Sequence, residues 1–459
     1  MSSGGAAHPL GQLDDTIVAL ATPAGRGATA LIRLSGPRAF SIAARHIEPW
    51  NAEPRTVQLC TVHQSGTALD QALVTVFAGP ESFTGENVVE ISTHGGLLVP
   101  SSIIATLISS GARQALPGEF TQRAVINGKI DILKAEAIGD LIDARSHAMQ
   151  RTALSQLDGG LSRRLVSLRD ELIGLEALIA YDIDFPEEDD GPVSRERIDA
   201  AIRSLSAALK QLLATASAGE LVREGAVVVI AGAPNVGKSS LFNALIGRSR
   251  AIVTEIPGTT RDAIEAVIDS GTWPLRLVDT AGLRATTDRI EQLGIEVSER
   301  YLSAAHVVLV CSDTDSGVEE TATVAAAKSS APMVKVRTKT DLVSQGDQLS
   351  LPDGTVAVSA ETGAGLEQLL AAIDEALGAR HGDVGSDSPM LTRTRHRQAV
   401  NSARSELIQF ERAWREEKLP ATVASVHLRT AVGALEELIG TVDVEDVFAR
   451  VFSSFCVGK

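Results

Sequence analysis

The stretch VVVIAGAPNVGKSSL, Val227 to Leu241, decides the fold at the centre of this 459-residue chain. Val227 to Ile230 are β-branched and predict a buried strand, and Leu241 to Ile246 predict a helix that ends at Gly247. Between them, Gly232 to Ser239 follow the pattern G-x-x-x-x-G-K-[ST]. The alternative is a plain glycine turn, but the strand, the loop and the helix that make a phosphate site are all present. The stretch therefore predicts binding of a nucleoside triphosphate.

The end of this loop carries two chemically distinct groups. Lys238 places a positive charge at the β- and γ-phosphates, and the Ser239 hydroxyl is a ligand for Mg²⁺. The loop residues predicted to contact the nucleotide are Asn235, Val236, Gly237, Lys238, Ser239 and Ser240.

Two strings further along supply groups that sense the third phosphate. Gly258-Thr-Thr-Arg-Asp262 offers Thr260, whose hydroxyl can ligate Mg²⁺ and whose N–H can contact the γ-phosphate. Asp279-Thr-Ala-Gly282 follows a strand predicted over residues 275–278. We expect Asp279 to hold Mg²⁺ through water and the Gly282 N–H to contact the γ-phosphate.

A further pair of strings predicts the choice of base. In Thr338-Lys-Thr-Asp341, the Asp341 carboxylate can accept both hydrogens of the guanine N1/N2 edge, a pair that adenine does not offer. Backbone N–H groups at Ser359 and Ala360 can face guanine O6, and Lys339 is counted with the nucleotide-binding residues. Four such strings in order indicate GTP rather than ATP.

Thr338 stands where this base-reading motif usually begins with Asn. A hydroxyl is shorter than a side-chain amide and cannot make all of its hydrogen bonds. We therefore expect a weaker hold on the nucleotide, with the preference for guanine kept by Asp341.

The sequence lacks the groups that usually catalyse GTP hydrolysis in small GTPases. Leu283 occupies the position that carries a water-orienting Gln in small GTPases, and no internal arginine finger is evident. A monovalent cation could replace that charge, held by the Asn235 amide oxygen and by carbonyls of the run Thr254-Glu-Ile-Pro-Gly-Thr259, namely those of Thr254, Ile256 and Thr259. Glu291 is the candidate for orienting the attacking water, its alternative being a surface carboxylate.

Composition describes an ordinary globular protein of two or three domains. The net charge is −16, so any RNA contact must come from a local basic face rather than from general attraction to phosphate. The three cysteines are isolated, which fits a reducing cytoplasm with neither a disulfide frame nor a zinc site. We expect no membrane span and interpret the first residues as a short disordered tail rather than a signal peptide.

The rest of the chain divides by its periodicity. Short strands with turn residues predict an α+β domain over residues 1–128, and apolar steps of three and four predict a helical domain over 129–222. Strands alternating with helices predict a Ras-like, doubly wound, mostly parallel sheet over 223–379. Helices return over 380–459, so the nucleotide-binding domain is expected to be inserted into a single helical bundle.

Two charged stretches leave alternatives open. The run from Tyr181 to Asp190 carries six acids and is interpreted as a solvated loop rather than a metal site. The cluster Arg393-Thr-Arg395-His-Arg397, with Arg404 farther on, is either a contact for tRNA or a solvated helix face.

Over nearly its whole length the chain resembles the tRNA-modification GTPases of the MnmE (TrmE) family. The resemblance is carried by DTIVALATPAGRG near the start, PESFTGENVVEISTHGG, LPGEFTQRA, DIDFPEED, AGAPNVGKSSL, IPGTTRD, DTAGLR and the terminal FSSFCVGK. Ordinary P-loop GTPases do not carry the Cys-Val-Gly-Lys ending, which makes it the most specific of these strings.

The resemblance implies more than periodicity can. It implies an N-terminal domain that binds tetrahydrofolate and forms a homodimer, and a flavin-containing partner, MnmG (GidA), in a heterotetramer that modifies C5 of the wobble uridine of certain tRNAs. A 5-formyl- or methylene-tetrahydrofolate is implied as one-carbon donor, with Arg33, Glu90, Lys129 and Lys459 at its site. Cys456 is either a catalytic thiol or a packed or auxiliary one, and we interpret it as the latter because no nearby base in the sequence would activate it. It also implies K⁺ at Asn235 and the switch I carbonyls, Glu291 in hydrolysis, and Arg284 as a residue that orders the switch.

Two other functions are alternatives. An RNA- or ribosome-assembly switch would use GTP only to regulate binding, but would have no use for a folate module or for the terminal Cys-Val-Gly-Lys. A folate enzyme active alone would need a complete acid–base set, which the sequence does not display.

Overall fold

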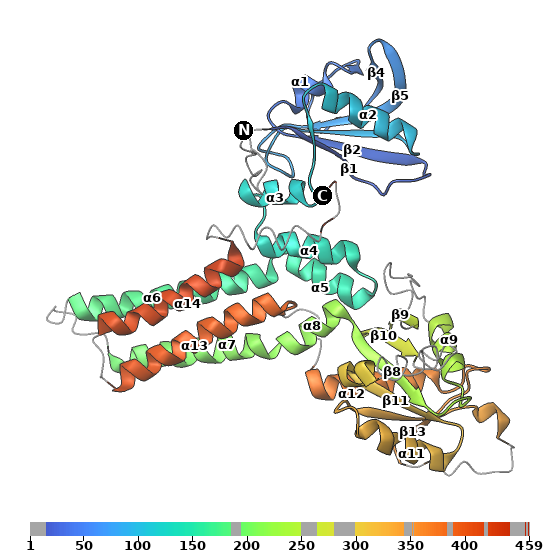
Figure 1. Cartoon of the computed structure of the whole chain (residues 1–459). Helices are drawn as coiled ribbons and strands as arrows, with labels where there is room; N and C mark the ends of the chain where they lie inside the picture. The colour runs from blue at the N-terminus through green and yellow to red at the C-terminus, as the bar shows by residue number, and fades with distance from the viewer. Residues whose placement is uncertain are drawn as a thin grey trace, which may run out of the picture. The chain divides into compact units, whose positions relative to one another are not determined.

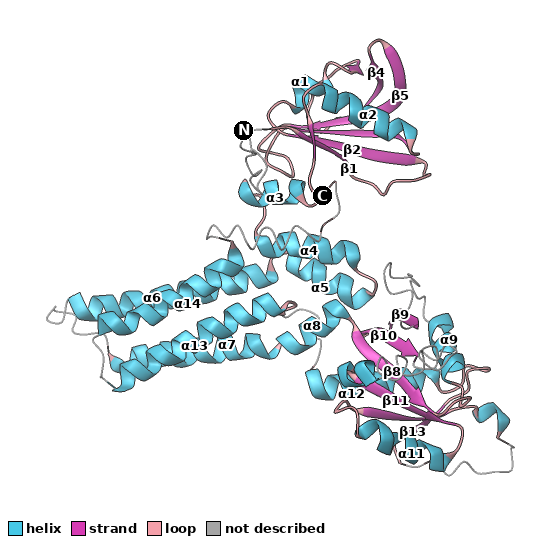
Figure 2. Ribbon diagram, viewed as in Figure 1, coloured by secondary structure: helices cyan, strands magenta, loops and turns pink. Residues whose placement is uncertain are grey.

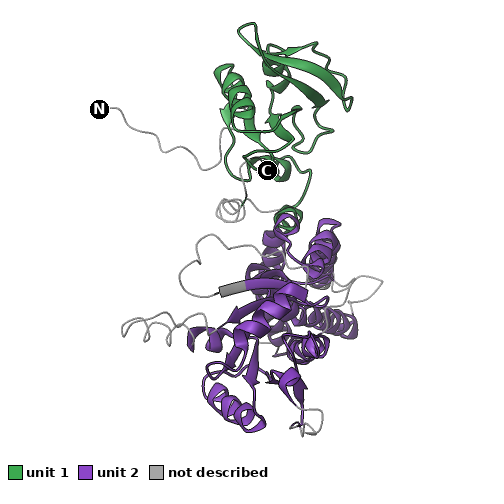
Figure 3. Ribbon diagram, turned by 90° about the vertical axis from the view of Figure 1, so that its right-hand side faces the viewer, with its two compact units in different colours: residues 1–139, 439–459 green, residues 140–438 purple. Residues whose placement is uncertain are grey.

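The structure, a computed structural model, describes residues 15–184, 194–248, 264–279, 299–343, 351, 353–382, 389–416, 421–440, 455 and 458. The chain separates by its contacts into two compact units, residues 1–139 with 439–459, and residues 140–438 (Figure 3). The C-terminal residues thus group with the N-terminal part of the chain. The fourfold division into 1–128, 129–222, 223–379 and 380–459 stays a prediction.

The first unit is built on a seven-stranded sheet in the order β3-β4-β5-β6-β2-β1-β7. Neighbouring strands are antiparallel except β1 and β7, which run parallel (Figure 1). The strands are β1 (Ile17–Leu20), β2 (Thr29–Ser35), β3 (Ile47–Glu48), β4 (Gln58–Gln64), β5 (Thr67–Phe77), β6 (Val88–His94) and β7 (Arg113–Gln114), and the helices are α1 (Ala39–Ala43), α2 (Leu98–Ser109) and α3 (Glu119–Ile126).

Alternation along the strands explains how this sheet gains its core. In β2, Ala30, Ile32 and Leu34 are buried while the residues between them are more exposed, because successive side chains of a strand point to opposite faces. The buried face packs on α2 through Ile103 and Leu107. On the other face, Ile17 and Ala19 of β1 pack with Phe120 of α3, and Arg33 of β2 lies directly opposite Glu90 of β6.

An ionic network around the buried Arg123 joins α3 to the segments beside β1, β6 and β7. Arg123, 1% exposed, donates to Asp15 at 2.5 Å, to Glu86 at 3.0 Å and to Glu119 at 3.0 Å. Arg113 donates to Asp15 and Glu119, each at 2.6 Å. Burial alone would raise the pKa of Glu119, but hydrogen bonds from Arg113, the Leu116 N–H and Arg123 outweigh it and hold the pKa below its usual value. The same balance lowers the pKa of Asp15.

These lowered pKa values predict loss of stability in acid. A carboxylate whose pKa is lower in the folded state contributes stability that is complete above its unfolded pKa, about 4, and is lost as pH falls through the folded pKa. Glu119→Gln should therefore flatten the decline in stability below pH ~5 and cost about 3 kcal/mol at neutral pH, because buried arginine charge loses a partner. Hydrogen exchange of the Arg113 and Ala115 amides, which donate to the Thr16 and Val18 carbonyls, measures this change in stability. The control is Glu81→Gln, which alters an exposed pair with Arg55. It should leave the stability at neutral pH and its decline in acid unchanged.

Helices before and after the nucleotide-binding domain pack together in the second unit. The helices are α4 (Ile132–Asp143), which begins in the first unit, α5 (His147–Leu157), α6 (Gly160–Asp184), α7 (Arg195–Ala214), α8 (Ala216–Glu224), α13 (Thr394–Glu416) and α14 (Ala421–Ile439). Ser146 and Ser194 cap α5 and α7 through the amides of Met149 and Arg197. Helix α7 packs on both α6 and α13, as Figures 1 and 2 show, so the inserted arrangement of the helices agrees with the prediction.

A six-stranded sheet in the order β13-β12-β11-β8-β10-β9 forms the nucleotide-binding domain. All pairs are parallel except β9 with β10. The elements are β8 (Ala226–Gly232), α9 (Lys238–Arg248), β9 (Ile264–Asp269), β10 (Pro274–Asp279), β11 (Val307–Ser312), α11 (Asp315–Ala326), β12 (Met333–Arg337), a 3₁₀ turn η2 (Thr340–Leu342), β13 (Thr355–Ala357) and α12 (Leu366–His381).

Both faces of this sheet are covered, which is why β8 reads as a continuous apolar run. Val228 and Ile230 pack on the side of α9 and α12. Val227 and Val229 pack on the opposite side, against Tyr301, Leu302 and Ala305. Since parallel strands carry helices on both faces, their side chains do not alternate between apolar and polar. The doubly wound, mostly parallel sheet predicted from the sequence is confirmed.

Some local predictions needed correction. Residues 181–184 continue α6 to Asp184 instead of beginning a loop, and the remaining acids of that run lie outside the described residues. Several elements, among them strands β3, β4, β7 and β9 and helices α1, α5 and α8, were not predicted individually. In the described part of the chain, no helix is both long and apolar enough to cross a membrane.

Candidate nucleotide-binding site

The loop from Gly232 to Lys238 joins β8 to α9 at the carboxyl end of the sheet. A Cβ atom at Gly232 would lie 2.3 Å from the Cys311 carbonyl oxygen, so only glycine lets β8 leave the sheet beside β11. Gly237 has φ +99° and Asn235 has φ +64°, both in the left-handed region. Asn tolerates that region better than most side chains. The loop therefore turns sharply and leads into the first turn of α9.

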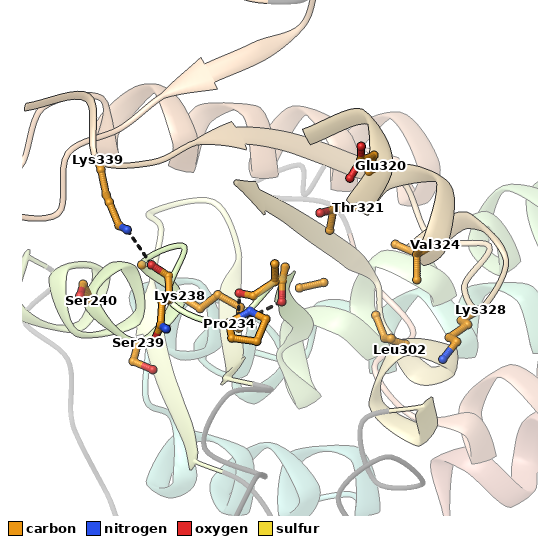
Figure 4. Close-up of a pocket in the computed structure, with 16 residues that line it drawn as sticks. Pro234, Lys238, Ser239, Ser240, Leu302, Glu320, Thr321, Val324, Lys328 and Lys339 are labelled. Carbon is orange, nitrogen blue, oxygen red and sulfur yellow. Dashed lines mark hydrogen bonds between the residues drawn. The ribbon is translucent and has the colours of Figure 1, made fainter. Parts of the chain in front are cut away.

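Lys238 and Ser239 begin helix α9 and line the cavity beside the loop (Figure 4). Lys238 is 6% exposed, and its Nζ donates to the Gly232 and Ala233 carbonyls at 3.0 and 2.8 Å. The Ser239 hydroxyl donates to Asp279 Oδ2 at 2.7 Å. The loop thus wraps around the ammonium group, and a hydroxyl and a carboxylate meet beside it.

The base-reading motif is fastened to this loop by two consecutive residues. The Thr338 hydroxyl lies 2.5 Å from the Val236 carbonyl and 3.1 Å from that of Ser312. Lys339 Nζ donates to the Asn235 carbonyl at 2.6 Å and to Asp313 at 2.9 Å, and this ion pair lowers the pKa of Asp313. Thr338 therefore connects the two loops although it is shorter than Asn. The weaker hold expected of Thr338 stays a prediction.

Asp341 is oriented by its neighbour across the base pocket. The Ser359 hydroxyl donates to Asp341 Oδ1 at 2.6 Å and itself accepts from the Thr362 amide at 3.2 Å. Gly365, the N-cap of α12, has φ +78° and lies so close to the end of β13 that an added Cβ would meet the Ala357 carbonyl. The two strings predicted to choose the base are thus brought together by β12 and β13.

Two adjoining cavities give the site its shape. One, of about 820 Å³, is lined by the phosphate loop together with Leu302, residues of α11 and Lys328 (Figure 4). The other, of about 460 Å³, is lined by Asp341, Ala360, Thr338 and the start of α9. Gly237, Ser240 and Lys339 line both. A phosphate site and a base site therefore share a wall, as a nucleotide spanning them would require.

Other predicted residues of this site lie outside the described residues. They are Thr254, Ile256, Thr259 and Thr260 of switch I, and Gly282, Leu283, Arg284 and Glu291 after Asp279.

The predicted folate residues fall in the first unit. Arg33 Nε and Nη2 both donate to Glu90 Oε1, at 2.9 and 2.7 Å, and the guanidinium lies 5.7 Å from the Phe120 ring. Lys129 reaches Gly85, where an added Cβ would meet its side chain at 3.3 Å. Cys456 and Lys459 lie outside the described residues. Gly458 rests on the Leu20 backbone, and Leu20 pairs with Ile32, the neighbour of Arg33.

The arginine cluster has less free positive charge for RNA than its sequence indicates, and the two described cysteines are buried. Arg393 pairs with Asp140 at 2.7 Å and Arg397 with Glu220 at 3.1 Å, so acids from other helices neutralise part of the cluster proposed for RNA. Burial raises the pKa of Cys311 to about 12 and also raises that of Cys60, so neither thiol ionises readily at neutral pH.

Two residues escaped the sequence reasoning. Asp313, which holds Lys339, follows a strand but belongs to no recognised string. Asp140 meets arginines from residues 223 and 393, far away along the chain, and no spacing in the sequence signals that meeting.

Comparison with known proteins agrees with this arrangement. Residues 132–456 match the MnmE helical domain, and residues 16–129 match the GTP-binding protein TrmE N-terminus. The chain is 42% identical to the tRNA modification GTPase MnmE of Moorella thermoacetica, over 97% of this chain and 100% of that protein. Proteins of the same name from Methylorubrum populi and Laribacter hongkongensis are each 42% identical, over 97% of this chain and 98% and 99% of theirs.

Proposed function

Because the chain belongs to the family of the tRNA modification GTPase MnmE, we propose that it hydrolyses GTP to drive modification of C5 of the wobble uridine in tRNA. The product is of the carboxymethylaminomethyl or aminomethyl type. The chain acts as a homodimer with a flavin-containing partner, MnmG (GidA), in a heterotetramer in the cytoplasm. The observation that carries the GTPase part is the shared wall between the phosphate cavity and the cavity that holds Asp341.

The described residues account for binding and orientation of GTP. Lys238 neutralises charge that grows on the β- and γ-phosphates during bond cleavage. Ser239 and Asp279 are 2.7 Å apart and have the oxygen ligands that Mg²⁺ prefers, so they fit this ion, Asp279 through water. Asp341 accepts the guanine N–H groups while Ser359 keeps its carboxylate in place.

A monovalent cation, K⁺, supplies the charge of the missing arginine finger. Asn235 lies in the phosphate loop, and its carbonyl is fixed by Lys339, so the residue is held at a defined place beside the cavity. Its amide oxygen has the chemistry of a K⁺ ligand, and carbonyls of Thr254, Ile256 and Thr259 complete the proposed set. Glu291 orients the attacking water in this scheme, assisted by Arg284 and Thr260.

Asn235→Gly tests this cation site. Glycine removes the amide while accepting φ +64° without strain, which alanine would not. We expect GTP turnover in K⁺ to fall about a hundredfold, toward the rate in Na⁺, because one charge-stabilising group is lost. Turnover is measured in K⁺ and in Na⁺ at equal ionic strength. The matched control, Asn243→Gly, lies on α9 at the base cavity and away from the phosphate loop, so it should keep the K⁺ to Na⁺ ratio of the unaltered protein whatever its effect on nucleotide affinity. An unchanged ratio in Asn235→Gly would remove K⁺ from the proposal and leave guanine binding intact.

Folate binding rests on Arg33, Glu90 and Lys129, with Lys459 arriving from the C-terminus. Arg33 and Glu90 are adjacent on β2 and β6, about a fifth to a quarter exposed, and offer a donor pair and an acceptor to a pterin edge or a glutamate tail. Bound 5-formyl- or methylene-tetrahydrofolate supplies a one-carbon unit. Cys456 is proposed as an auxiliary thiol.

A further inference from the structure

The chain enters and leaves the nucleotide-binding domain through two short segments that meet at one carboxylate. Helix α8 ends at Glu224 and leads directly into β8, and residues 389–393 lead into α13 (Figure 1). Arg223 is the basic residue of the incoming segment, and Arg393 is that of the outgoing one. Arg223 Nε and Arg393 Nη2 both donate to Asp140 Oδ1 of α4, at 3.1 and 2.7 Å.

The outgoing segment is held against the helical domain by further contacts. The Leu391 amide donates to Thr215 Oγ1 at 3.1 Å, and the buried Gln156 amide group donates to Thr392 Oγ1 at 3.0 Å. A Cβ atom at Gly219 would lie 2.3 Å from the Leu391 carbonyl oxygen, so α8 and this segment touch backbone to backbone. The two segments therefore run in direct contact beside Asp140.

Charge makes Asp140 the central member of this contact. Its side chain is 17% exposed, and those of Arg223 and Arg393 are 32% and 20% exposed. At such partly buried positions two guanidinium groups on one carboxylate attract it strongly, and without it they repel each other. Asp140 also borders a cavity of about 100 Å³ that Gln156 and Thr392 line. The clasp itself is made of polar groups, and it lies beside Val222 and Met390, which the incoming and outgoing segments bury in one apolar core.

We propose that Asp140 is a positioning residue that clasps the incoming and outgoing segments together, so that a displacement of the nucleotide-binding domain reaches α4 through both segments at once. The clasp takes no part in GTP hydrolysis itself. Its role is to link hydrolysis to the tRNA chemistry, which goes beyond the proposed GTPase cycle. With the clasp closed, the incoming and outgoing segments move together and displace α4 as one body. Without it, each segment moves independently.

Hydrogen exchange tests the clasp without relying on any activity. In Asp140→Asn, nearly isosteric, protection of the Leu391 and Gly225 amides should fall roughly tenfold because the segments separate more often. Arg223→Gln and Arg393→Gln should each lower this protection less, because each leaves Asp140 paired with the other arginine. Adding Arg223→Gln to Asp140→Asn should restore part of the protection, since it removes the repulsion between arginines. Glu176→Gln, which breaks the α6–α14 pair with Arg429, is the matched control and should leave both amides protected.

Activity then separates the clasp from the proposed function. In Asp140→Asn we expect GTP turnover within about twofold of the unaltered protein and tRNA modification in the full complex reduced about tenfold or more. Unchanged amide protection in Asp140→Asn, or modification that falls only in step with GTP turnover, would overturn the clasp. Absence of any tRNA modification by the unaltered protein would overturn the proposed function, while the exchange data would still decide the clasp.

Discussion

Lys238→Met should lower kcat/KM for GTP by about a thousandfold, because the methionine keeps the stem and loses the charge that stabilises the transferring phosphoryl group. Lys238 is 6% exposed, and its ammonium group is held by the Gly232 and Ala233 carbonyls, which fixes the charge beside the phosphate cavity. GTP turnover at several concentrations measures the effect.

Lys328 provides the matched control within the same cavity. It lines the far end of the phosphate cavity and pairs with Glu299 at 2.8 Å (Figure 4). Lys328→Met should change kcat/KM by less than about twofold, because an exposed ion pair contributes little. Equal losses in the two variants, or none in Lys238→Met, would contradict the placement of the phosphates on the loop.

Asp341→Asn is expected to weaken GTP binding about a thousandfold. The amide presents a donor to the guanine N1–H and leaves buried donors facing each other, which costs far more than a lost contact. The same amide can pair with a base that carries a carbonyl at C2, so affinity for xanthosine triphosphate should rise. Calorimetric titration with GTP and with xanthosine triphosphate measures both affinities in the variant and in the unaltered protein.

The neighbours of Asp341 sharpen this test. Ser359→Ala removes the hydroxyl that donates to Asp341 at 2.6 Å and should weaken GTP binding by about tenfold, without a gain for xanthosine triphosphate. Asp353→Asn, exposed and before β13, should change neither. GTP binding of unaltered strength in Asp341→Asn would contradict the assignment of the base pocket.

The nucleotide-binding domain was predictable because its signals are local. Val227 to Ile230, Gly232 and Lys238 lie in one short stretch, and the parallel strands are apolar runs that end in recognisable strings. Strand β4 was missed because Gln58, Thr61, His63 and Gln64 dilute its apolar residues. Helix α8 is short, with its buried positions occupied largely by Ala218, Gly219 and other small residues, so its periodicity is weak.

The parts of the site that were not predictable depend on distant contacts. Thr338 reads as a defect in its motif, but the fold brings its hydroxyl to the Val236 carbonyl. Asp140 and Asp313 are ordinary surface acids by sequence, and their partners come from other elements. Spacing shows which residues share one helix or loop, but it does not show which of two distant segments will lie side by side.

Mass analysis of tRNA nucleosides tests the central claim most directly, in a strain that lacks this chain and carries either the unaltered protein or Asp341→Asn. We expect C5-substituted wobble uridine to be lost in the deletion, to return with the unaltered protein and to stay absent with Asp341→Asn. Full C5 substitution in the deletion strain, or its return with Asp341→Asn, would contradict a GTP-driven role in uridine modification.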